Sequence, residues 1–220
     1  MKLKKEHKFT LAADGSAASG KTTGAKIISK KYGLKFLSSG LLYRFASYQL
    51  LKYKPKNKIK FLQLEFKKLN YNKLAKINLH SSKISEYTSI IAKQKKIRNI
   101  LKKFQKDFAF KNKKVCIEGR DIGSVILPKA DLKLFFICNL NIAARRRYKE
   151  LKRKNKNINF KIVKKELQKR NLRDVSRKNS PLLKSSDAVI VDTGKLRNIS
   201  SMVKKMCKIM DRKILDKYGS

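Results

Sequence analysis

The residues Gly15-Ser16-Ala17-Ala18-Ser19-Gly20-Lys21-Thr22 form a complete G-x-x-x-x-G-K-[ST] pattern. The apolar stretch 9–13 before it is typical of a buried strand, and residues 22–32 after it predict a helix that ends at Gly33. A strand, a glycine-rich loop and a helix N-terminus direct backbone N–H groups at one point, where the helix dipole favours an anion. The pattern therefore predicts a phosphate-binding loop rather than a chance glycine-rich turn. In such a loop Lys21 reaches the β- and γ-phosphates and the Thr22 hydroxyl holds Mg²⁺.

Composition limits the class of protein. The chain has 220 residues, of which 41% are hydrophobic, enough for one α/β core with a small insert. No run of about 18 apolar residues predicts a membrane span, and the basic segment 1–6 lacks the apolar stretch of a secretory signal. Three widely spaced cysteines and two histidines favour reduced core thiols over a disulfide framework or a zinc site. These features predict a cytoplasmic protein.

The net charge of +43, from 58 Lys and Arg against 15 Asp and Glu, has two interpretations. It is typical of proteins that bind nucleic acid or anionic surfaces. It also follows from AT-rich coding, which raises Lys, Asn and Ile throughout a proteome. The lysines are spread along the chain without a basic arm, which favours coding bias. We therefore expect nonspecific binding of polyanions at low salt and no specific nucleic-acid partner.

Strands and helices alternate along the chain, which predicts a doubly wound sheet of about five parallel strands. Further strands are predicted at 35–37, 114–117, 132–138 and 188–191, and further helices at 40–52, 85–108, 143–154, 160–172 and 199–218. Residues 58–80 show weak periodicity and are predicted to be an insert. Ligands of such sheets bind at the C-terminal strand ends. Candidate residues therefore follow the strands: Asp14-Gly15, Ser38-Ser39-Gly40, Glu118-Gly119-Arg120-Asp121 and Asp192.

The residues after the second strand predict a second anion pocket. Ser39, Tyr43 and Arg44 share one side of the first helical turns. A hydroxyl, a phenol and a guanidinium could there hold a phosphate ester. The alternative is that Ser39 caps the helix and Arg44 lies at the surface.

Two segments carry most of the remaining site candidates. The loop 118–124 follows the third strand, and its Arg120 and Asp121 are either ligand-binding residues or a surface ion pair. Arginines recur at 145–147 and, with Asp174, at 170, 173 and 177, where the spacing places the four residues on one helical face. In a chain rich in lysine, arginine at these positions favours bidentate phosphate binding. The two helices involved predict a hairpin that closes over a triphosphate, with a basic solvent-facing hairpin as the alternative.

The sequence shows no catalytic histidine, nucleophile triad or metal cluster near these residues. That pattern suits phosphoryl transfer to an acceptor phosphate that is already ionised. Such a reaction depends on alignment and charge neutralisation rather than on proton abstraction.

Four motifs, in order, resemble the bacterial cytidylate kinase family, a branch of the P-loop nucleoside monophosphate kinases. They are the loop from Asp14 to Thr23, Ser39-Gly40 with Tyr43-Arg44, Gly119-Arg120-Asp121-Ile122-Gly123, and Arg170 to Leu182. The combination separates this family from adenylate, guanylate and shikimate kinases. The resemblance covers most of the chain and implies phosphorylation of CMP and dCMP by ATP with Mg²⁺, in a monomer.

The resemblance also implies roles for individual residues. ATP would contact Gly15, Ser16, Ala17, Ala18, Ser19, Gly20, Lys21, Thr22 and Thr23, while Arg146 and Arg147 would clamp the transferred group. CMP would contact Ser39, Tyr43, Arg44, Ser89, Arg98, Arg120, Asp121, Arg170, Asp174 and Arg177. Mg²⁺ would contact Thr22 directly and Glu118 through water. The family pattern divides the chain into a core (8–52, 109–142 and 183–220), an insert (about 53–108) and a lid (about 143–182).

The chain departs from the family pattern at three places. Ser38-Ser39-Gly40 replaces the usual Asp-Ser-Gly or Thr-Gly, Glu118 replaces an aspartate, and residues 60–88 match poorly. Two alternatives stay open: a kinase for another small acceptor such as UMP, or a basic P-loop protein that binds nucleic acid.

Overall fold

The computed structural model describes residues 3–153, 157–196 and 198–219. The chain forms two compact units, one made of Met1–Leu37 with Asn112–Ser220 and the other of Ser38–Lys111. The second unit starts earlier than the insert expected from about residue 53. It does so because the helix that follows Ser38 packs against later helices of the same unit.

The first unit is built on the predicted parallel sheet. Its strands, in the order β2-β3-β1-β4-β5 across the sheet, are numbered along the chain as β1 (Phe9–Gly15), β2 (Lys35–Ser38), β3 (Lys114–Gly119), β4 (Leu132–Ile137) and β5 (Val189–Asp192). The central strand β1 pairs in parallel with β3 and β4, and β4 pairs in parallel with β5. In this register Asp14 lies beside Gly119 and Gly15 beside Phe136. The predicted phosphate loop therefore leaves the sheet next to the loop that follows β3.

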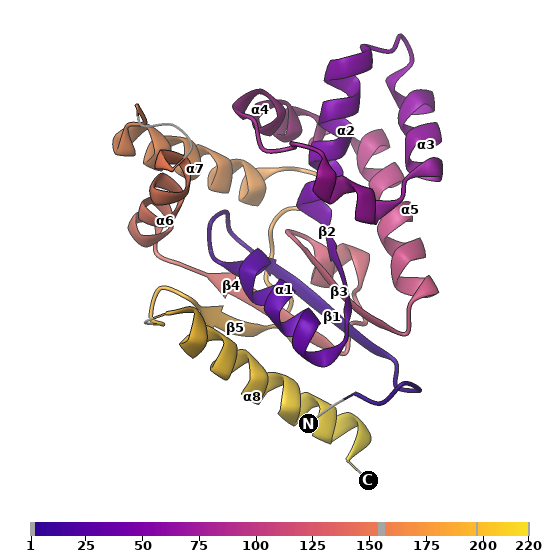
Figure 1. Ribbon diagram of the computed structural model, residues 1–220, viewed down its shortest axis with the longest axis vertical. Helices are drawn as coiled ribbons and strands as arrows, with labels where there is room; N and C mark the ends of the chain where they lie inside the picture. The colour runs from indigo at the N-terminus through magenta and orange to yellow at the C-terminus, as the bar shows by residue number, and fades with distance from the viewer. Residues whose placement is uncertain (1–2, 154–156, 197, 220) are drawn as a thin grey trace. The chain divides into compact units, whose positions relative to one another are not determined.

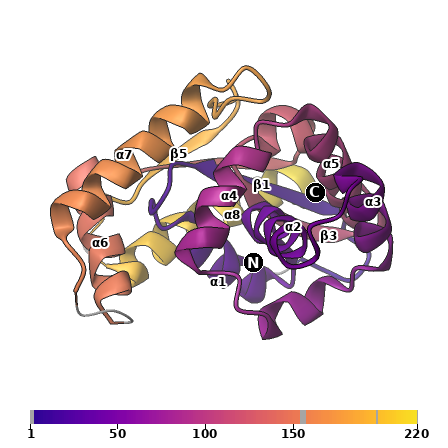
Figure 2. The same cartoon turned by 90° about the horizontal axis from the view of Figure 1, so that it is seen from above.

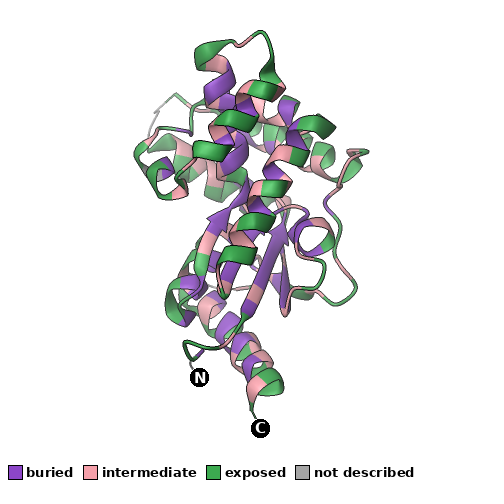
Figure 3. Cartoon of the chain, turned by 90° about the vertical axis from the view of Figure 1, so that its right-hand side faces the viewer, coloured by how far each residue is buried: buried purple, intermediate pink, exposed green. Residues whose placement is uncertain are grey.

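Helices α1 (Lys21–Tyr32) and α8 (Ile199–Tyr218) pack together and against the sheet (Figure 1). Ile28 of α1, Met206 of α8 and Phe136 of β4 are fully buried in one apolar cluster. The central strands are almost entirely buried, while the helices expose their polar sides (Figure 3). Among the described residues, no helix is both long and apolar enough to cross a membrane.

The first unit also carries a helical hairpin, α6 (Leu140–Lys152) and α7 (Phe160–Ser176), which lie side by side (Figure 2). The rings of Tyr148 and Phe160 meet edge to face across it. The hairpin predicted from the two arginine segments is thus confirmed. Its first helix was expected to reach Lys154, which lies outside the described residues.

The second unit is helical throughout its secondary structure. It consists of α2 (Ser39–Tyr53), α3 (Lys58–Lys68), the short helix η1 (Tyr71–Lys76), α4 (Ser82–Ile91) and α5 (Lys95–Lys111). Helix α3 falls in the stretch that showed weak periodicity. Its N-cap is Asn57, whose side chain accepts the N–H of Lys60, and the helix buries Leu62 and Phe66 one turn apart. Its lysine-rich outer surface hides this narrow apolar stripe in the sequence.

The prediction of a single helix over 85–108 is wrong, because the helix is interrupted between Ile91 and Lys95. No glycine or proline marks the break. The end of α4 is tightened by i→i+3 hydrogen bonds, and the Arg98 guanidinium donates to the carbonyl of Ala92. Ile90 is exposed while Ile91 is buried, because neighbouring residues of one helix are about 100° apart around its axis, so the two do not share one apolar face.

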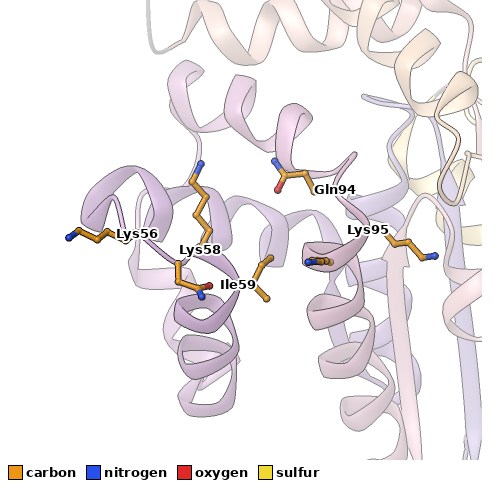
Figure 4. A pocket seen from close by; sticks show the side chains of 7 residues that line it. Lys56, Lys58, Ile59, Gln94 and Lys95 are labelled. Carbon is orange, nitrogen blue, oxygen red and sulfur yellow. The ribbon is translucent and has the colours of Figure 1, made fainter.

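A hollow of about 450 Å³ lies beside the N-terminal ends of α3 and α5 (Figure 4). Its lining is Lys56, Asn57, Lys58, Ile59, Gln94, Lys95 and Lys96. None of the predicted site residues lines it.

Two leucines on α3 provide a test of this packing. Leu62 is fully buried and Leu64 is 51% exposed. We expect Leu62→Ala to lower the free energy of unfolding by about 2–5 kcal/mol, because it leaves a cavity. We expect Leu64→Ala to change it by at most about 0.5 kcal/mol. Denaturant titrations followed by circular dichroism measure both, and equal effects would contradict the buried stripe.

Candidate active site

The predicted phosphate loop has the backbone form that its glycines allow. Gly15 has φ 150°, and a Cβ there would lie 2.2 Å from the carbonyl oxygen of Phe136. Gly20 has φ 79° and caps the N-terminus of α1. Both conformations are rare for residues with a side chain. Within the loop, the Ser19 hydroxyl donates to the carbonyl of Ser16 at 2.9 Å. Glycines at the two ends thus let the loop pass close to β4 and turn into the helix.

The lysine of the loop is buried against a carboxylate. Lys21 Nζ lies 3.4 Å from Glu118 Oε2, and both side chains are less than 10% exposed. Burial, reinforced by the charge of Arg120, lowers the pKa of Lys21 to about 8, while Glu118 opposes the shift. The structure therefore brings together the ends of β1 and β3, as predicted. Glu118, expected at Mg²⁺ through water, is here the counter-ion of Lys21.

Asp14 joins the two loops at this edge of the sheet. Its carboxylate accepts the backbone N–H of Ile122 at 2.9 Å and that of Gly123 at 2.7 Å. These residues open a wide turn, η2 (Ile122–Ile126), which the sequence did not predict. Burial raises the pKa of Asp14 to about 6, although the two N–H bonds oppose the shift. Asp14 thus holds the loop after β3 in register with the phosphate loop.

A buried cluster of arginines and carboxylates links that loop to α7. Arg120 Nε donates to Asp174 Oδ2 at 2.7 Å. The Arg177 guanidinium lies 3.7 Å from Asp174 and 3.8 Å from Asp121. The alternative of a surface ion pair at Arg120 and Asp121 is wrong, because these four side chains are 6–18% exposed.

Electrostatics brings Arg170 into the same cluster. Burial would raise the pKa of Asp174, but Arg120, with Arg170 and Arg177, outweighs burial and lowers it. The prediction of four residues on one helical face needs correction. Arg173 is exposed and donates to the carbonyl of Lys169. Arg177 lies just beyond the helix with extended backbone, which lets it turn back toward Asp121 and Asp174.

The helical hairpin packs directly on the phosphate loop. Ala17 of the loop, Ala143 and Ala144 of α6, and Leu167 of α7 form one buried cluster. Asn171 of α7 accepts the backbone N–H of Ala17 at 3.0 Å. Asn171 is a site residue that the sequence motifs did not predict, although its polar side chain lies next to Arg170 in the sequence.

The two lid arginines have partners within the protein. Arg146 donates from both terminal nitrogens to Thr193, at 3.0 and 2.8 Å. Arg147 pairs with Glu150 on the same helix at 2.8 Å. Thr193 was not predicted either, although it directly follows Asp192 at the C-terminal end of β5, where ligands of parallel sheets bind.

In the second unit, the structure brings Tyr43 and Arg98 together. Arg98 is 7% exposed, and its guanidinium lies 5.6 Å from the centre of the Tyr43 ring, a cation–π contact. Arg44 instead donates to the carbonyl of Leu79 and to the hydroxyl of Ser85.

Ser38 and Ser89 of this unit have local hydrogen-bond partners. Ser39 is buried but does not cap the helix, because the side chain of Ser38 accepts the Leu41 N–H and fills that role. Ser89 donates to the carbonyl of Glu86 within α4. The alternative that Ser39 is the helix cap is therefore wrong.

Among the described residues, no three Asp, Glu, His or Cys side chains lie close enough together to hold a metal ion. The three cysteines are free thiols. Mg²⁺ in nucleotide sites commonly has one or two protein ligands and completes its shell with phosphates and water. The Thr22 hydroxyl in the first turn of α1 and the Glu118 carboxylate beside Lys21 have the oxygen chemistry that this ion prefers.

A phosphate loop on the central strand and an arginine-bearing hairpin packed on it define the class, a P-loop α/β phosphotransferase. The family model described as cytidylate kinase matches residues 11–212. The chain therefore belongs to the cytidylate kinase family.

Curated relatives of this family align with the chain over nearly their whole length. A cytidylate kinase of Thermosipho melanesiensis is 35% identical over 92% of this chain and 97% of its own. A cytidylate kinase of Clostridium tetani is 36% identical over 95% of this chain and 96% of its own. A cytidylate kinase of Bartonella quintana is 37% identical over 92% of this chain and 94% of its own.

Solved structures at low identity support the fold alone. A Thermus thermophilus protein superposes with a TM-score of 0.53 at 13% identity, over 95% of this chain and 99% of its own. An uncharacterized protein of Eubacterium ventriosum superposes with a TM-score of 0.52 at 15% identity, over 93% of this chain and 99% of its own.

The pKa of Asp14 predicts a pH-dependent stability. A carboxyl whose pKa rises on folding stabilises the fold below its unfolded value, and that contribution is lost as the pH rises through the folded value. For Asp14 these values are 3.8 and about 6. We expect the stability of the wild type relative to Asp14→Asn to fall by about 3 kcal/mol across this window and then to stay level. Denaturant titrations at several pH values measure the difference, which isolates Asp14 because the two proteins share every other titrating group. A difference independent of pH would contradict the assignment.

Proposed function

We propose that this chain transfers the γ-phosphoryl group of ATP to CMP or dCMP, giving ADP and CDP or dCDP. Membership of the cytidylate kinase family supports this reaction. The observation that carries the proposal is the buried Lys21, at the junction of the phosphate loop and α1, in the same unit as a buried arginine–carboxylate cluster. The buried Lys21 suits a triphosphate, and the arginine–carboxylate cluster suits an anionic acceptor.

ATP would bind along the phosphate loop, through the backbone N–H groups and side chains of residues 15–23. The helix N-terminus and Lys21 supply positive charge for the β- and γ-phosphates. Thr22 would hold Mg²⁺ directly and Glu118 would hold it through water. When bound, this ion neutralises the charge that builds up on the phosphate oxygens. Glu118 would then exchange its contact with Lys21 for the hydrated ion, as Lys21 turns to the phosphates.

CMP would be held by residues of two groups. In the first unit, Arg120 and Asp121 would fix its phosphate and sugar, Arg170 and Asp174 its phosphate and ribose, and Arg177 its cytosine edge or phosphate. In the second unit the proposed contacts are Ser39, Tyr43, Arg44, Ser89 and Arg98. The Tyr43–Arg98 contact supports this assignment, because it places a guanidinium and an aromatic ring side by side, and both residues are buried.

Transfer needs no general base, because the acceptor phosphate is already ionised at neutral pH. The residues would instead align donor and acceptor and neutralise the charge spread over the transferred group. Lys21, Arg120 and Asp121 belong to the buried centre. Arg146 and Arg147 would join it only by leaving Thr193 and Glu150. Closure of the hairpin over the triphosphate is the motion this requires.

Three further properties belong to the proposal. The enzyme would act as a monomer in the cytoplasm, where its free thiols stay reduced. Small nucleotides would be its partners. Polyanions would bind it nonspecifically at low salt through its charge of +43.

The acceptor can be tested with a panel. ADP release with ATP·Mg²⁺ is measured at physiological salt for CMP, dCMP, UMP, AMP, GMP and shikimate. We expect strong turnover with CMP and dCMP alone, and a loss of kcat by orders of magnitude in Lys21→Ala with the fold intact. Turnover with UMP alone would favour the other acceptor, and near-normal turnover in a folded Lys21→Ala would remove the role of the lysine.

Arg177 tests the acceptor side. We expect Arg177→Ala to raise the KM for CMP by about tenfold or more, in line with the loss of a charged hydrogen bond, and the KM for ATP much less. Arg173→Ala is the matched control, since this arginine of α7 is exposed and donates to the carbonyl of Lys169. Initial rates at varied concentrations of each nucleotide give both constants. Equal weakening of the two nucleotides would contradict the placement.

A further inference from the structure

Thr193 is a buried residue outside every motif that was used to assign the site. It follows β5 directly and is 2% exposed. Its hydroxyl donates to the carbonyl of Ser19 in the phosphate loop at 2.9 Å. Its backbone N–H donates to the carbonyl of Ile137 at 3.0 Å, and its own carbonyl accepts from Arg146 at 2.8 Å. One side chain therefore touches the phosphate loop while its backbone is tied to the end of β4 and to α6.

The direction of the hydroxyl proton follows from its neighbours. Arg146 Nη1 lies 3.0 Å from Thr193 Oγ1, and a guanidinium can only donate. The hydroxyl is therefore the acceptor from Arg146, and its single proton must go to a carbonyl. The carbonyl of Ser19 at 2.9 Å is closer than that of Ile137 at 3.3 Å, which already accepts the Thr193 N–H. Until Arg146 leaves Thr193 on closure of the hairpin, its donation also polarises the hydroxyl and strengthens the bond to Ser19.

This bond sets the orientation of one peptide unit in the loop. The Ser19–Gly20 peptide is planar and trans, so its C=O and N–H point in opposite directions. Holding the Ser19 carbonyl on Thr193 aims the Gly20 N–H away from Thr193. Gly20 is the N-cap of α1, directly before Lys21, and the N–H groups at this place in a phosphate loop cradle phosphates.

Gly20 needs such an external restraint. Its φ of 79° requires glycine, and the same freedom makes the preceding peptide easy to rotate. Thr193 and Arg146 lie directly against it. A Cβ on Gly20 would be 3.8 Å from Thr193 Cγ2 and 3.9 Å from Arg146 Nη1.

We propose that Thr193 is a positioning residue of the kinase, whose hydroxyl holds the Ser19–Gly20 peptide so that the Gly20 N–H faces the phosphates of ATP. The inference rests on the proposed assignment of the loop to ATP. It adds a residue on the donor side that lies outside the loop. Its effect is confined to ATP and ADP and leaves CMP unaffected.

The test separates the hydroxyl from the shape of the side chain. Thr193→Val keeps the shape but removes the hydroxyl, both as the donor to Ser19 and as the acceptor from Arg146, whereas Thr193→Ser keeps the hydroxyl and loses one methyl group. We expect Thr193→Val to weaken ADP binding, measured by calorimetry, about tenfold and to raise the KM for ATP by a similar factor. The KM for CMP should stay within about twofold. Thr193→Ser should stay within about twofold for all three constants.

Thr10→Val controls for a structural loss. It removes another threonine hydroxyl bond, from Thr10 to Asp131, near the opposite end of β1, so it should leave ADP affinity unchanged at a comparable thermal midpoint. If Thr193→Val does not fold, Thr193→Ala is the second variant without the donor. The proposal is overturned if the hydroxyl-free variant binds ADP like Thr193→Ser, or if it weakens ADP and CMP equally.

Lys21→Ala separates the role of the loop in ATP binding from the role of Thr193. If this variant loses ADP affinity while Thr193→Val keeps it, the loop assignment stands and only the role of Thr193 fails. If Lys21→Ala keeps its ADP affinity, the assignment of the loop to ATP fails, and the role of Thr193 fails with it.

Discussion

A side chain on Gly15 would place its Cβ 2.2 Å from the carbonyl oxygen of Phe136, so the chain can leave β1 at this point only through glycine. That close approach fixes where the phosphate loop begins relative to β4. Three other contacts depend on the same starting point. Asp14, one residue earlier, holds the loop after β3, and Lys21, at the far end of the loop, reaches Glu118. Ser19 between them is held by Thr193. The loop is thus held by β4 where it begins, by the end of β3 and the loop after it, and by the residue that follows β5.

The second constraint is electrostatic. Arg120, Arg170 and Arg177 act together on Asp174, and Arg177 also pairs with Asp121. Three guanidinium groups and two carboxylates in a mostly buried place are costly unless their charges and hydrogen bonds match. The carboxylates fix the directions of the arginines before any ligand arrives. The remaining positive charge suits a dianionic phosphate, which fits the proposed acceptor.

The sequence predicted the parallel sheet, the strand, glycine loop and helix of residues 9–32, the hairpin and the family, and all four are confirmed. These predictions succeed because a motif is local, since a glycine at a fixed spacing and a strand before it suffice to define the loop. The sequence failed where the signal was not local. Helix α3 was missed because lysines surround the buried Leu62 and Phe66. The break after Ile91 was missed because backbone hydrogen bonds and Arg98, rather than glycine or proline, produce it.

By itself the sequence determined the class of chemistry, since a phosphate loop and arginines after the strands need only residue types and spacing. Tertiary structure decided which side chains meet. Arg173 and Arg177 look equivalent on a helical wheel, but the backbone is extended at Arg177, which reaches two carboxylates while Arg173 stays in solvent. Thr193 lies 174 residues from Ser19 along the chain, and only the parallel register of β1, β4 and β5 brings its hydroxyl to the loop. Contacts of this kind depend on where strands end beside one another, which no local pattern contains.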